Sequence, residues 1–392
     1  MIMTQPTCST RSWRRPGALL LGGVLALNVA SAEEIIHERI ESEEHDLRLV
    51  RMVSGLEHPW GMAVLPDGRF LVTQRTGQMV LIDGGEVTEL DGVPEVSAQG
   101  QGGLLDVVLH PRYGEENGGE GDNDWIYFAY SKPGDDGTAS ALARARLEGE
   151  SLTDVEELFE QDRNSSPGRH YGSRLAWQED GTLLMTVGDR GVEPERAQAG
   201  DDHAGSVLRL TDTGGVPDDN PFVDDDGVLD EIFTLGNRNI QGLAVAADGA
   251  IWASEHGPLG GDELNLIEAG ENYGWPEASR GVDYGTREPI GVESLPEMRD
   301  AVYVYADRFA PSGLAQVDSE RFGEWQDNLL AGGLRSEELK RLVIEDGEVV
   351  YRERVLQGQI GRIRDVRQGP DGYLYLLNDA GDGGLYRLEP AD

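Results

Sequence analysis

The sequence predicts an all-β fold, and three observations point to a β-propeller. Apolar runs recur in pairs around an Asp-Gly turn signal, at Asp67-Gly68, Asp180-Gly181, Asp248-Gly249 and Asp371-Gly372. No stretch shows the period of a long amphipathic helix. Repeated short-strand units of this kind are typical of propellers. Six blades of four strands fit the 392 residues at somewhat over ~50 residues each.

The N-terminus has the pattern of a secretory signal peptide over residues 1–32. Three arginines precede an apolar run at 18–29, and Ala30-Ser31-Ala32 supplies small residues for cleavage. The apolar run is too short to span a membrane. We therefore expect a single propeller domain over residues 33–392, in a periplasmic or secreted protein with no membrane insertion after cleavage.

The composition is strongly acidic, with a formal net charge of −40. Loss of residues 1–32 would remove three arginines and no acids, which leaves −43. This charge excludes nucleic acid and anionic membrane surfaces as partners. Lysine occurs only at Lys132 and Lys340, and an acid-rich, lysine-poor surface indicates a salty, halophilic habitat where counterions screen self-repulsion. The single cysteine, Cys8, lies in the signal peptide, so disulfides contribute nothing to the mature chain.

The elements follow one another in short units. A charged segment at Glu33–Glu44 is expected to be a loose leader into the fold. The runs that we expect as early strands are Leu47–Val53, Gly61–Leu65, Phe70–Gln74, Met79–Asp83, Leu104–His110 and Trp125–Ser131. Ser319–Asp327 is a candidate short helix. Asp218–Asp230 is acidic but lacks the spacing of a calcium loop, so we expect a solvated loop there.

The candidate site is organised around a predicted hairpin, formed by the apolar runs Leu243–Ala246 and Ala250–Ala253 around Asp248-Gly249. Polar segments lie at both of its ends, Gly236–Asn239 on one side and Glu255–Glu263 on the other. A rigid hairpin with polar, glycine-rich ends presents a site from its loops. Because the loops at one end of a propeller channel converge, residues far apart in sequence can share that site.

Several side chains in such loops suit acid–base or anion chemistry. His170 can take a proton near neutral pH, and Asp189 follows the next strand, where a carboxylate could orient the imidazole. From the pattern alone, an ordinary loop histidine is the commoner interpretation. Arg362 and Arg364 point the same way on a strand, so an anion or acidic neighbours must neutralise them. Gln101 lies in a glycine-rich loop that allows close backbone approach.

Many motifs in one order resemble the glucose/sorbosone dehydrogenase family, the soluble sugar dehydrogenases that use pyrroloquinoline quinone. The resemblance covers the chain from about Leu56 to the C-terminus. It rests on GQGGLLDVVLHP, GRHYGSRLAW, TVGDRG, VPDDNPF, GNRNIQGLA, SEHGPLGGDELN, ENYGWP, APSG and RIRDVRQGPDGYLYLLND. It implies six blades, bound pyrroloquinoline quinone and calcium, and oxidation of a sugar with electrons passed to an external acceptor. We expect a monomer.

The resemblance also implies residue roles. His170 would be the catalytic base that takes the proton of an aldose's anomeric hydroxyl, with Asp189 as its partner. Arg238 would stabilise charge on the quinone oxygen. The residues implied to contact the cofactor are Gln101, Arg238, Asn239, Tyr284, Arg335, Arg362 and Arg364. The carbonyls of Gly257 and Pro258 would hold the calcium beside the quinone, and a second calcium would lie near Glu263 and Tyr273.

Two departures from the family pattern keep alternatives open. Asn237 and Ile240 replace the usual histidine and proline, and Ala306-Asp307-Arg308 brings charge before the APSG motif. One alternative is a non-catalytic carbohydrate-binding propeller that has lost the quinone. The other is a calcium-dependent lactonase on a similar propeller, which needs a central calcium ringed by carboxylates and amides and has no need of paired arginines.

Overall fold

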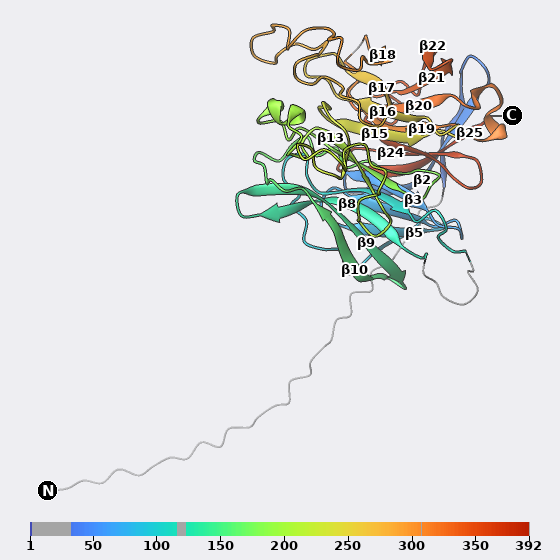
Figure 1. The fold of residues 1–392 in the computed structure, drawn as a ribbon. Coiled ribbons are helices and arrows are strands. Elements are labelled where there is room, and N and C mark those ends of the chain that lie inside the picture. Colours follow the sequence, from blue (N-terminus) through green and yellow to red (C-terminus); the bar gives the residue numbers. More distant parts are fainter. Residues whose placement is uncertain (2–32, 116–122, 307, 392) are drawn as a thin grey trace.

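Six antiparallel β-sheets form a ring in the computed structural model of the chain (Figure 1). The structure describes Met1 and residues 33–115, 123–306 and 308–391. The expected signal peptide therefore lies, apart from Met1, outside the described residues. The sheets follow chain order around the ring, so the expectation of a six-bladed β-propeller is confirmed.

The first three blades are four-stranded meanders. Blade one contains β3 (Pro59–Val64), β4 (Phe70–Gln74), β5 (Met79–Asp83) and β6 (Glu86–Glu89). Blade two contains β7 (Leu104–Leu109), β8 (Ile126–Gly134), β9 (Gly137–Glu148) and β10 (Ser151–Glu160). Blade three contains β11 (Leu175–Trp177), β12 (Leu183–Val187), β13 (Ser206–Leu210) and β14 (Ile232–Thr234).

The last three blades complete the ring. Blade four contains β15 (Ile240–Val245), β16 (Ile251–Glu255), β17 (Glu263–Ile267) and β18 (Tyr303–Val304). Blade five contains β19 (Pro311–Gln316), β20 (Leu329–Gly333), β21 (Leu339–Glu345) and β22 (Glu348–Val355). Blade six contains β23 (Ile363–Gln368), β24 (Leu374–Asn378), β25 (Gly383–Pro390), β2 (Leu47–Leu56) and β1 (Glu34–Ile40).

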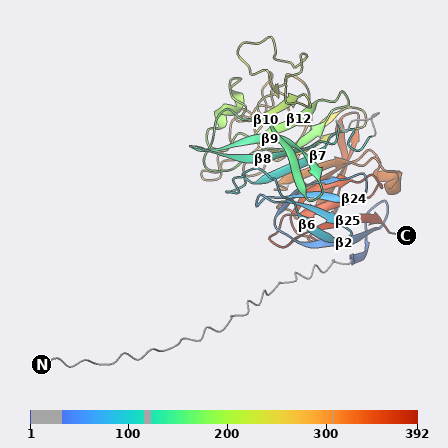
Figure 2. The same cartoon turned by 90° about the horizontal axis from the view of Figure 1, so that it is seen from below.

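Blade six joins the two ends of the described fold. Strand β2 pairs with β25 from Leu47–Pro390 to Leu56–Gly383, and the strands lie side by side in Figure 2. Strand β1 adds a fifth strand outside β2. The expectation of a loose leader at Glu33–Glu44 was therefore wrong, because Ile36 and Ile40 pack against the core of this blade.

The Asp-Gly turns predicted from the sequence lie between the first and second strands of blades one, three, four and six. Their glycines, Gly68, Gly181, Gly249 and Gly372, all have φ between 80 and 89°. This left-handed backbone favours glycine, which explains why the signal recurs.

Helical structure is limited to two 3-10 segments among the described residues. They are η1 (Pro194–Gln198) and η2 (Glu320–Trp325), and the second lies within the candidate helix Ser319–Asp327. Across the described ranges, no helix has the length and apolar character needed to cross a membrane.

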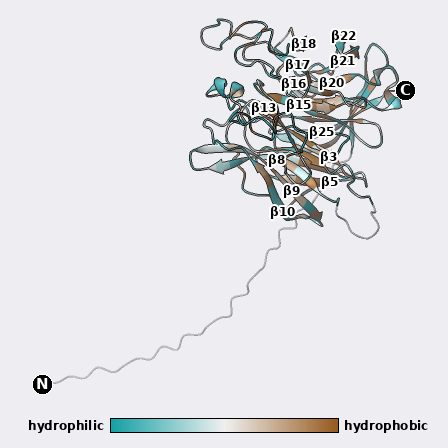
Figure 3. Cartoon of the chain, in the orientation of Figure 1, coloured by the Kyte–Doolittle hydropathy of each residue, from teal (hydrophilic) through white to brown (hydrophobic). Residues whose placement is uncertain are grey.

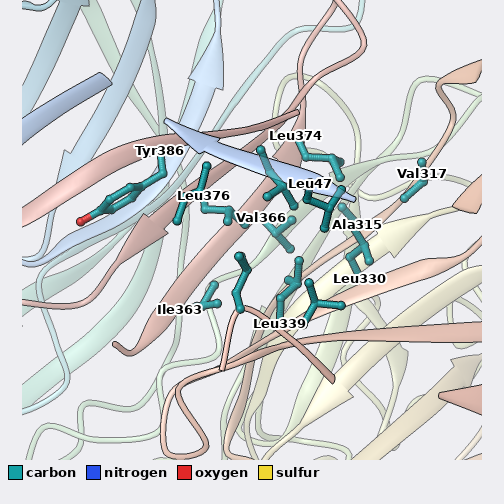
Figure 4. Packing of buried hydrophobic residues seen from close by; sticks show 14 of the residues in the cluster. Leu47, Ala315, Val317, Leu330, Leu339, Ile363, Val366, Leu374, Leu376 and Tyr386 are labelled. Atoms are coloured by element: carbon teal, nitrogen blue, oxygen red, sulfur yellow. The ribbon is translucent and has the colours of Figure 1, made fainter. Parts of the chain in front are cut away.

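The core consists of apolar layers between neighbouring blades. Figure 3 shows hydrophobic residues along the strands and hydrophilic residues on loops and outer edges. The largest layer lies between blades five and six, where Leu47 from β2 packs beside Val366, Leu376 and Leu330 (Figure 4). Closure of the ring is thus stabilised by apolar burial as well as by strand pairing.

Arg174, just before β11, connects all six innermost strands across the channel. Its guanidinium donates to the Asp365 Oδ1 atom at 2.7 Å, to the Gln241 carbonyl at 2.6 Å and to the Arg364 carbonyl at 2.8 Å. It also lies 3.4 Å from Asp106 and within reach of the Ser312 hydroxyl in blade five, and it stacks 4.1 Å from the Trp60 ring in blade one. Only 1% of the Arg174 side chain is exposed.

We predict that Arg174→Ala is severely destabilising. Removal of the guanidinium leaves two buried carboxylates short of a partner, and breaking such pairs costs on the order of 3–5 kcal/mol. Urea unfolding followed by tryptophan fluorescence would measure the loss. Arg39→Ala is the matched control, since the Arg39–Asp46 pair is exposed and should contribute under about 1 kcal/mol. Equal losses for both variants would contradict the role of Arg174.

Candidate functional site

A cavity of about 320 Å³ opens where the innermost strands begin. Its floor contains a small cluster of buried apolar side chains from blades one, two and three: Trp60, Leu105 and Tyr171. Its walls are polar and come from all six blades. They are formed by Arg75, Gly100, Gln101, Gly172, Asn239, Gln241, His256, Ala310, Leu334, Arg362, Arg364 and Asp379.

His170 and Asp189 form a buried pair on the rim of this cavity. The His170 Nδ1 atom lies 2.6 Å from Asp189 Oδ1, and the His170 backbone N–H donates to Gln101 Oε1 at 2.8 Å. The second carboxylate oxygen of Asp189 accepts the Trp275 indole N–H at 2.8 Å. His170 also has φ 50°, an uncommon backbone conformation that the surrounding contacts must maintain.

These contacts select the tautomer of His170. Because the buried Asp189 carboxylate accepts only, the imidazole carries its proton on Nδ1 and presents a lone pair on Nε2. Burial lowers the pKa of His170, and the hydrogen bond that its Nδ1–H donates to Asp189 offsets this only in part. Burial acts to raise the pKa of Asp189, but the contact with His170 and the charge of Arg238 outweigh it and leave the pKa lowered. The pair is therefore a neutral imidazole held by an ionised carboxylate.

Arg238 lies between His170 and the Glu255–Asp262 loop. Its Nη2 atom lies 3.4 Å from His170 Nε2, while Nη1 donates to the His256 carbonyl at 3.0 Å and to the Gly257 carbonyl at 2.9 Å. The backbone N–H groups of Arg238 and Asn239 both donate to the buried Glu255 carboxylate, as does the side chain of Asn237. Asn237, one of the two family departures, thus fixes Glu255 beneath this loop.

Arg362 and Arg364 converge on Asp379, as their spacing predicted for an acidic neighbour. Asp379 Oδ2 accepts from Arg364 at 2.8 Å and from Arg362 at 3.1 Å, and Oδ1 lies 2.8 Å from His58 Nδ1. Burial lowers the pKa of Arg364 to about 10. For Asp379, burial would raise the pKa, but the guanidinium charge dominates and lowers it.

Three of the four residues expected to hold metal ions lie around a second, smaller space. A cavity of about 20 Å³, room for one ion or water, is lined in part by Gly257, Glu263 and Tyr273. Burial, followed by the charge of Glu255, raises the pKa of Glu263 to about 8. The Pro258 carbonyl instead accepts the Tyr284 hydroxyl at 2.8 Å. No cluster of three or more His, Cys, Asp or Glu side chains suited to a metal occurs in the described part of the chain.

The structure brings most of the predicted site residues together. His256 lines both cavities, so the small space adjoins the large one. Arg335 is exposed on the rim, where its backbone follows Leu334, a lining residue. Asp307, part of the second family departure, lies outside the described residues.

Sequence reasoning missed several polar residues of the site. Asp379 and Glu255 were not singled out, and neither was Arg75. A signal was present: Asp189, Glu255 and Asp379 each lie at or just beyond the end of the second strand of a blade. In a propeller all these positions face the same mouth.

The fold and the site define a class: six-bladed propellers with an acid–base pair and an arginine-rich pocket at one mouth of the channel. The particular family follows from comparison with known proteins. Residues 56–387 match the family model described as Glucose / Sorbosone dehydrogenase. The chain belongs to this family, which makes it an oxidoreductase of sugars and confirms the resemblance seen in the motifs.

Individual relatives agree with this assignment. The chain is 40% identical over 344 residues to the aldose sugar dehydrogenase YliI of Escherichia coli strain K12, covering 86% of this chain and 91% of the relative. A crystal structure of the soluble E. coli aldose sugar dehydrogenase in the apo-form superposes with a TM-score of 0.83 at 37% identity, covering 88% and 99% of the two chains. The PQQ-bound aldose sugar dehydrogenase of Streptomyces coelicolor gives 0.72 at 29% identity, covering 89% and 99%.

We predict that Asp379→Asn destabilises the chain by on the order of 3 kcal/mol at low salt, because it leaves two guanidinium groups without their counter-ion. Sulfate should recover more stability in this variant than in the parent chain, since an added anion can replace the carboxylate. Thermal unfolding in matched chloride and sulfate buffers would measure both effects. Asp382→Asn, an exposed neighbour, is the control. A sulfate response equal to that of the parent would contradict the assigned counter-ion role.

Proposed function

We propose that the protein oxidises the anomeric hydroxyl of an aldose to a lactone with pyrroloquinoline quinone and calcium, and passes the electrons to an external acceptor. The carrying observation is the largely buried His170–Asp189 pair, whose Nε2 atom lies 3.4 Å from Arg238 Nη2 at the channel mouth. The PQQ-bound relative from Streptomyces coelicolor and the quinoprotein glucose dehydrogenase B of Acinetobacter calcoaceticus support the choice of cofactor. We further propose that the mature chain acts as a monomer in the periplasm or outside the cell.

The donors in the large cavity fit an anionic quinone. The Nε–H group of Arg364 in this cavity and that of Arg238 in the adjoining small cavity are buried without a hydrogen-bond partner among the described residues. Asn239 and Gln101 add amide groups to the same walls. Guanidinium groups match carboxylates in geometry as well as charge, so this set would hold a planar tricarboxylate.

Calcium fits the neighbouring carbonyls. Gly257 and Pro258 present backbone oxygens that now accept from Arg238 and Tyr284, and calcium favours such oxygen ligands. The buried Glu263 carboxylate, whose pKa is raised by burial and by the charge of Glu255, suits the proposed second ion with Tyr273. When bound, the quinone supplies the hydride acceptor and calcium supplies a Lewis acid that polarises it.

The chain's own residues would then manage the proton and the charge. His170 accepts the anomeric proton at Nε2, because its Nδ1 proton is already donated to Asp189. Asp189 stabilises the imidazolium that forms. Arg238 is fixed by two carbonyl contacts and aims its second amino group at the reacting region, where it stabilises negative charge that develops there.

The lactonase alternative is disfavoured by what lies at the centre of the channel. That mechanism needs a cation there, and this chain instead places the Arg174 guanidinium among Asp106 and Asp365. A second positive charge at that place would be repelled. A lactonase also has no need of the paired guanidinium groups of Arg362 and Arg364.

The test is a dye-reduction assay on the mature chain, with and without pyrroloquinoline quinone and calcium, against a panel of aldoses. Activity is expected only when both are added. His170→Ala should lower turnover by about 10² to 10⁴-fold, while quinone binding, followed by absorbance titration, stays nearly intact. Unchanged turnover would remove His170 from the mechanism. No activity and no quinone binding would refute the proposed function and favour the non-catalytic carbohydrate-binding propeller instead.

The pH dependence follows from the lowered pKa of His170. The base must be neutral, so kcat/KM should fall only as pH drops through a midpoint below 6.5, the ordinary value. In Asp189→Asn the carboxylate no longer stabilises imidazolium, so the midpoint should move lower still, with a rate loss of at least ~10²-fold. A parent midpoint above 7, or an unshifted midpoint in the variant, would contradict this assignment.

A further inference from the structure

Two arginines on the His170 side of the cavity have no carboxylate partner among the described residues. Arg75 lines the large cavity and donates through Nη1 to the Gly100 carbonyl at 2.7 Å. Arg169, the residue before His170, is exposed and donates to the Gly191 carbonyl. Both contacts use neutral backbone oxygens, so both guanidinium charges remain uncompensated.

The loop geometry places these charges close to the base. Gln101 N–H donates to the Gly168 carbonyl at 2.9 Å, and a Cβ atom on Gly100 would lie 2.2 Å from that same oxygen, so the two loops pack backbone to backbone. The Arg75 guanidinium donates to the Gly100 carbonyl, and the His170 backbone N–H donates to the side chain of the adjacent residue, Gln101. Cα atoms of adjacent residues are ~3.8 Å apart. Arg75 and the His170 backbone therefore contact adjacent residues of one loop.

The two sides of the cavity differ in how their charges are paired. Arg362 and Arg364 come from blade six and share Asp379, and they are the groups proposed for the quinone. The charged lining residues are these three and Arg75, which leaves an excess of two positive charges. This occurs in a chain whose net charge is −40. An arginine without a carboxylate partner in so acidic a protein is suited to an anion that arrives from solution.

We propose that the preferred substrate is an aldose that carries an anionic group, a carboxylate or a phosphate, at the end remote from its anomeric carbon. Arg75, assisted by Arg169, would bind that group while the anomeric hydroxyl lies against His170. The inference rests on the proposed function. The oxidation itself is unchanged: C1 loses a hydride to the quinone and the hydroxyl proton goes to His170, which yields a lactone that keeps its anionic group.

The first measurement is equilibrium binding by calorimetry to the mature chain without added quinone, using galacturonate against galactose and glucose 6-phosphate against glucose. We expect each anionic sugar to bind about tenfold more tightly, or better, than its neutral partner. The pair with the larger ratio identifies the preferred anionic group. Arg75→Gln should remove most of the preference, and Arg169→Gln part of it. Arg112→Gln is the control, because Arg112 is exposed beyond the other end of β7.

The second measurement is kcat/KM for the same sugars with quinone and calcium, which separates the two proposals. Oxidation of neutral sugars without any preference for the anionic ones would overturn this inference and leave the dehydrogenase function intact. No oxidation of any sugar would overturn the proposed function, while the binding ratio would still decide the role of Arg75. A weaker quinone titration in Arg75→Gln, with an unchanged sugar ratio, would assign Arg75 to the cofactor and refute the inference.

Discussion

The ring depends on one buried cation. Arg174 reaches five neighbouring blades from its own, and its partners Asp106 and Asp365 are held in turn by Arg367 and by the backbone N–H groups of Leu175 and Met62. Buried charges are costly unless every group is paired, so this network tolerates little displacement of any inner strand. Gln241 and Arg364 contact Arg174 and also line the large cavity, so the same network fixes the position of the site.

The acid–base pair and the arginine pair of the site come from different blades. The acid–base pair comes from blade three, with Trp275 as its outer support, while the guanidinium pair and its counter-ion come from blade six across the channel. Arg238 lies between them and contacts both the base and the carbonyls of the next loop. A ligand that spans the cavity would therefore meet a proton acceptor at one end and fixed positive charge at the other, a polarity that suits the oxidation of an alcohol by an anionic acceptor.

Much of this arrangement was predictable. The Asp-Gly turns located the inner hairpins of four of the six blades, and the ordered motifs located His170, Asp189 and Arg238. The spacing of Arg362 and Arg364 required a neutralising group but could not identify Asp379, because that contact joins two strands through register. Arg174 was missed for the same reason: its role arises from six strands that meet, and no local pattern records it. The prediction of a loose leader at Glu33–Glu44 was wrong because the many charged residues of this segment outweighed the two isoleucines, Ile36 and Ile40, through which β1 packs against the core.

The closure of blade six has a consequence for biosynthesis. Arg364 and Asp379 lie on a sheet whose outer strands come from the opposite end of the chain, so the N-terminal strand must wait until the last residues have been made. Blade six, which carries these two cavity residues, is thus completed only after the last strand of the chain has been made. A chain whose synthesis is unfinished, or one that has lost β1 and β2 to a protease, would lack this closed blade, so ligand binding in the large cavity would select for molecules that have folded completely.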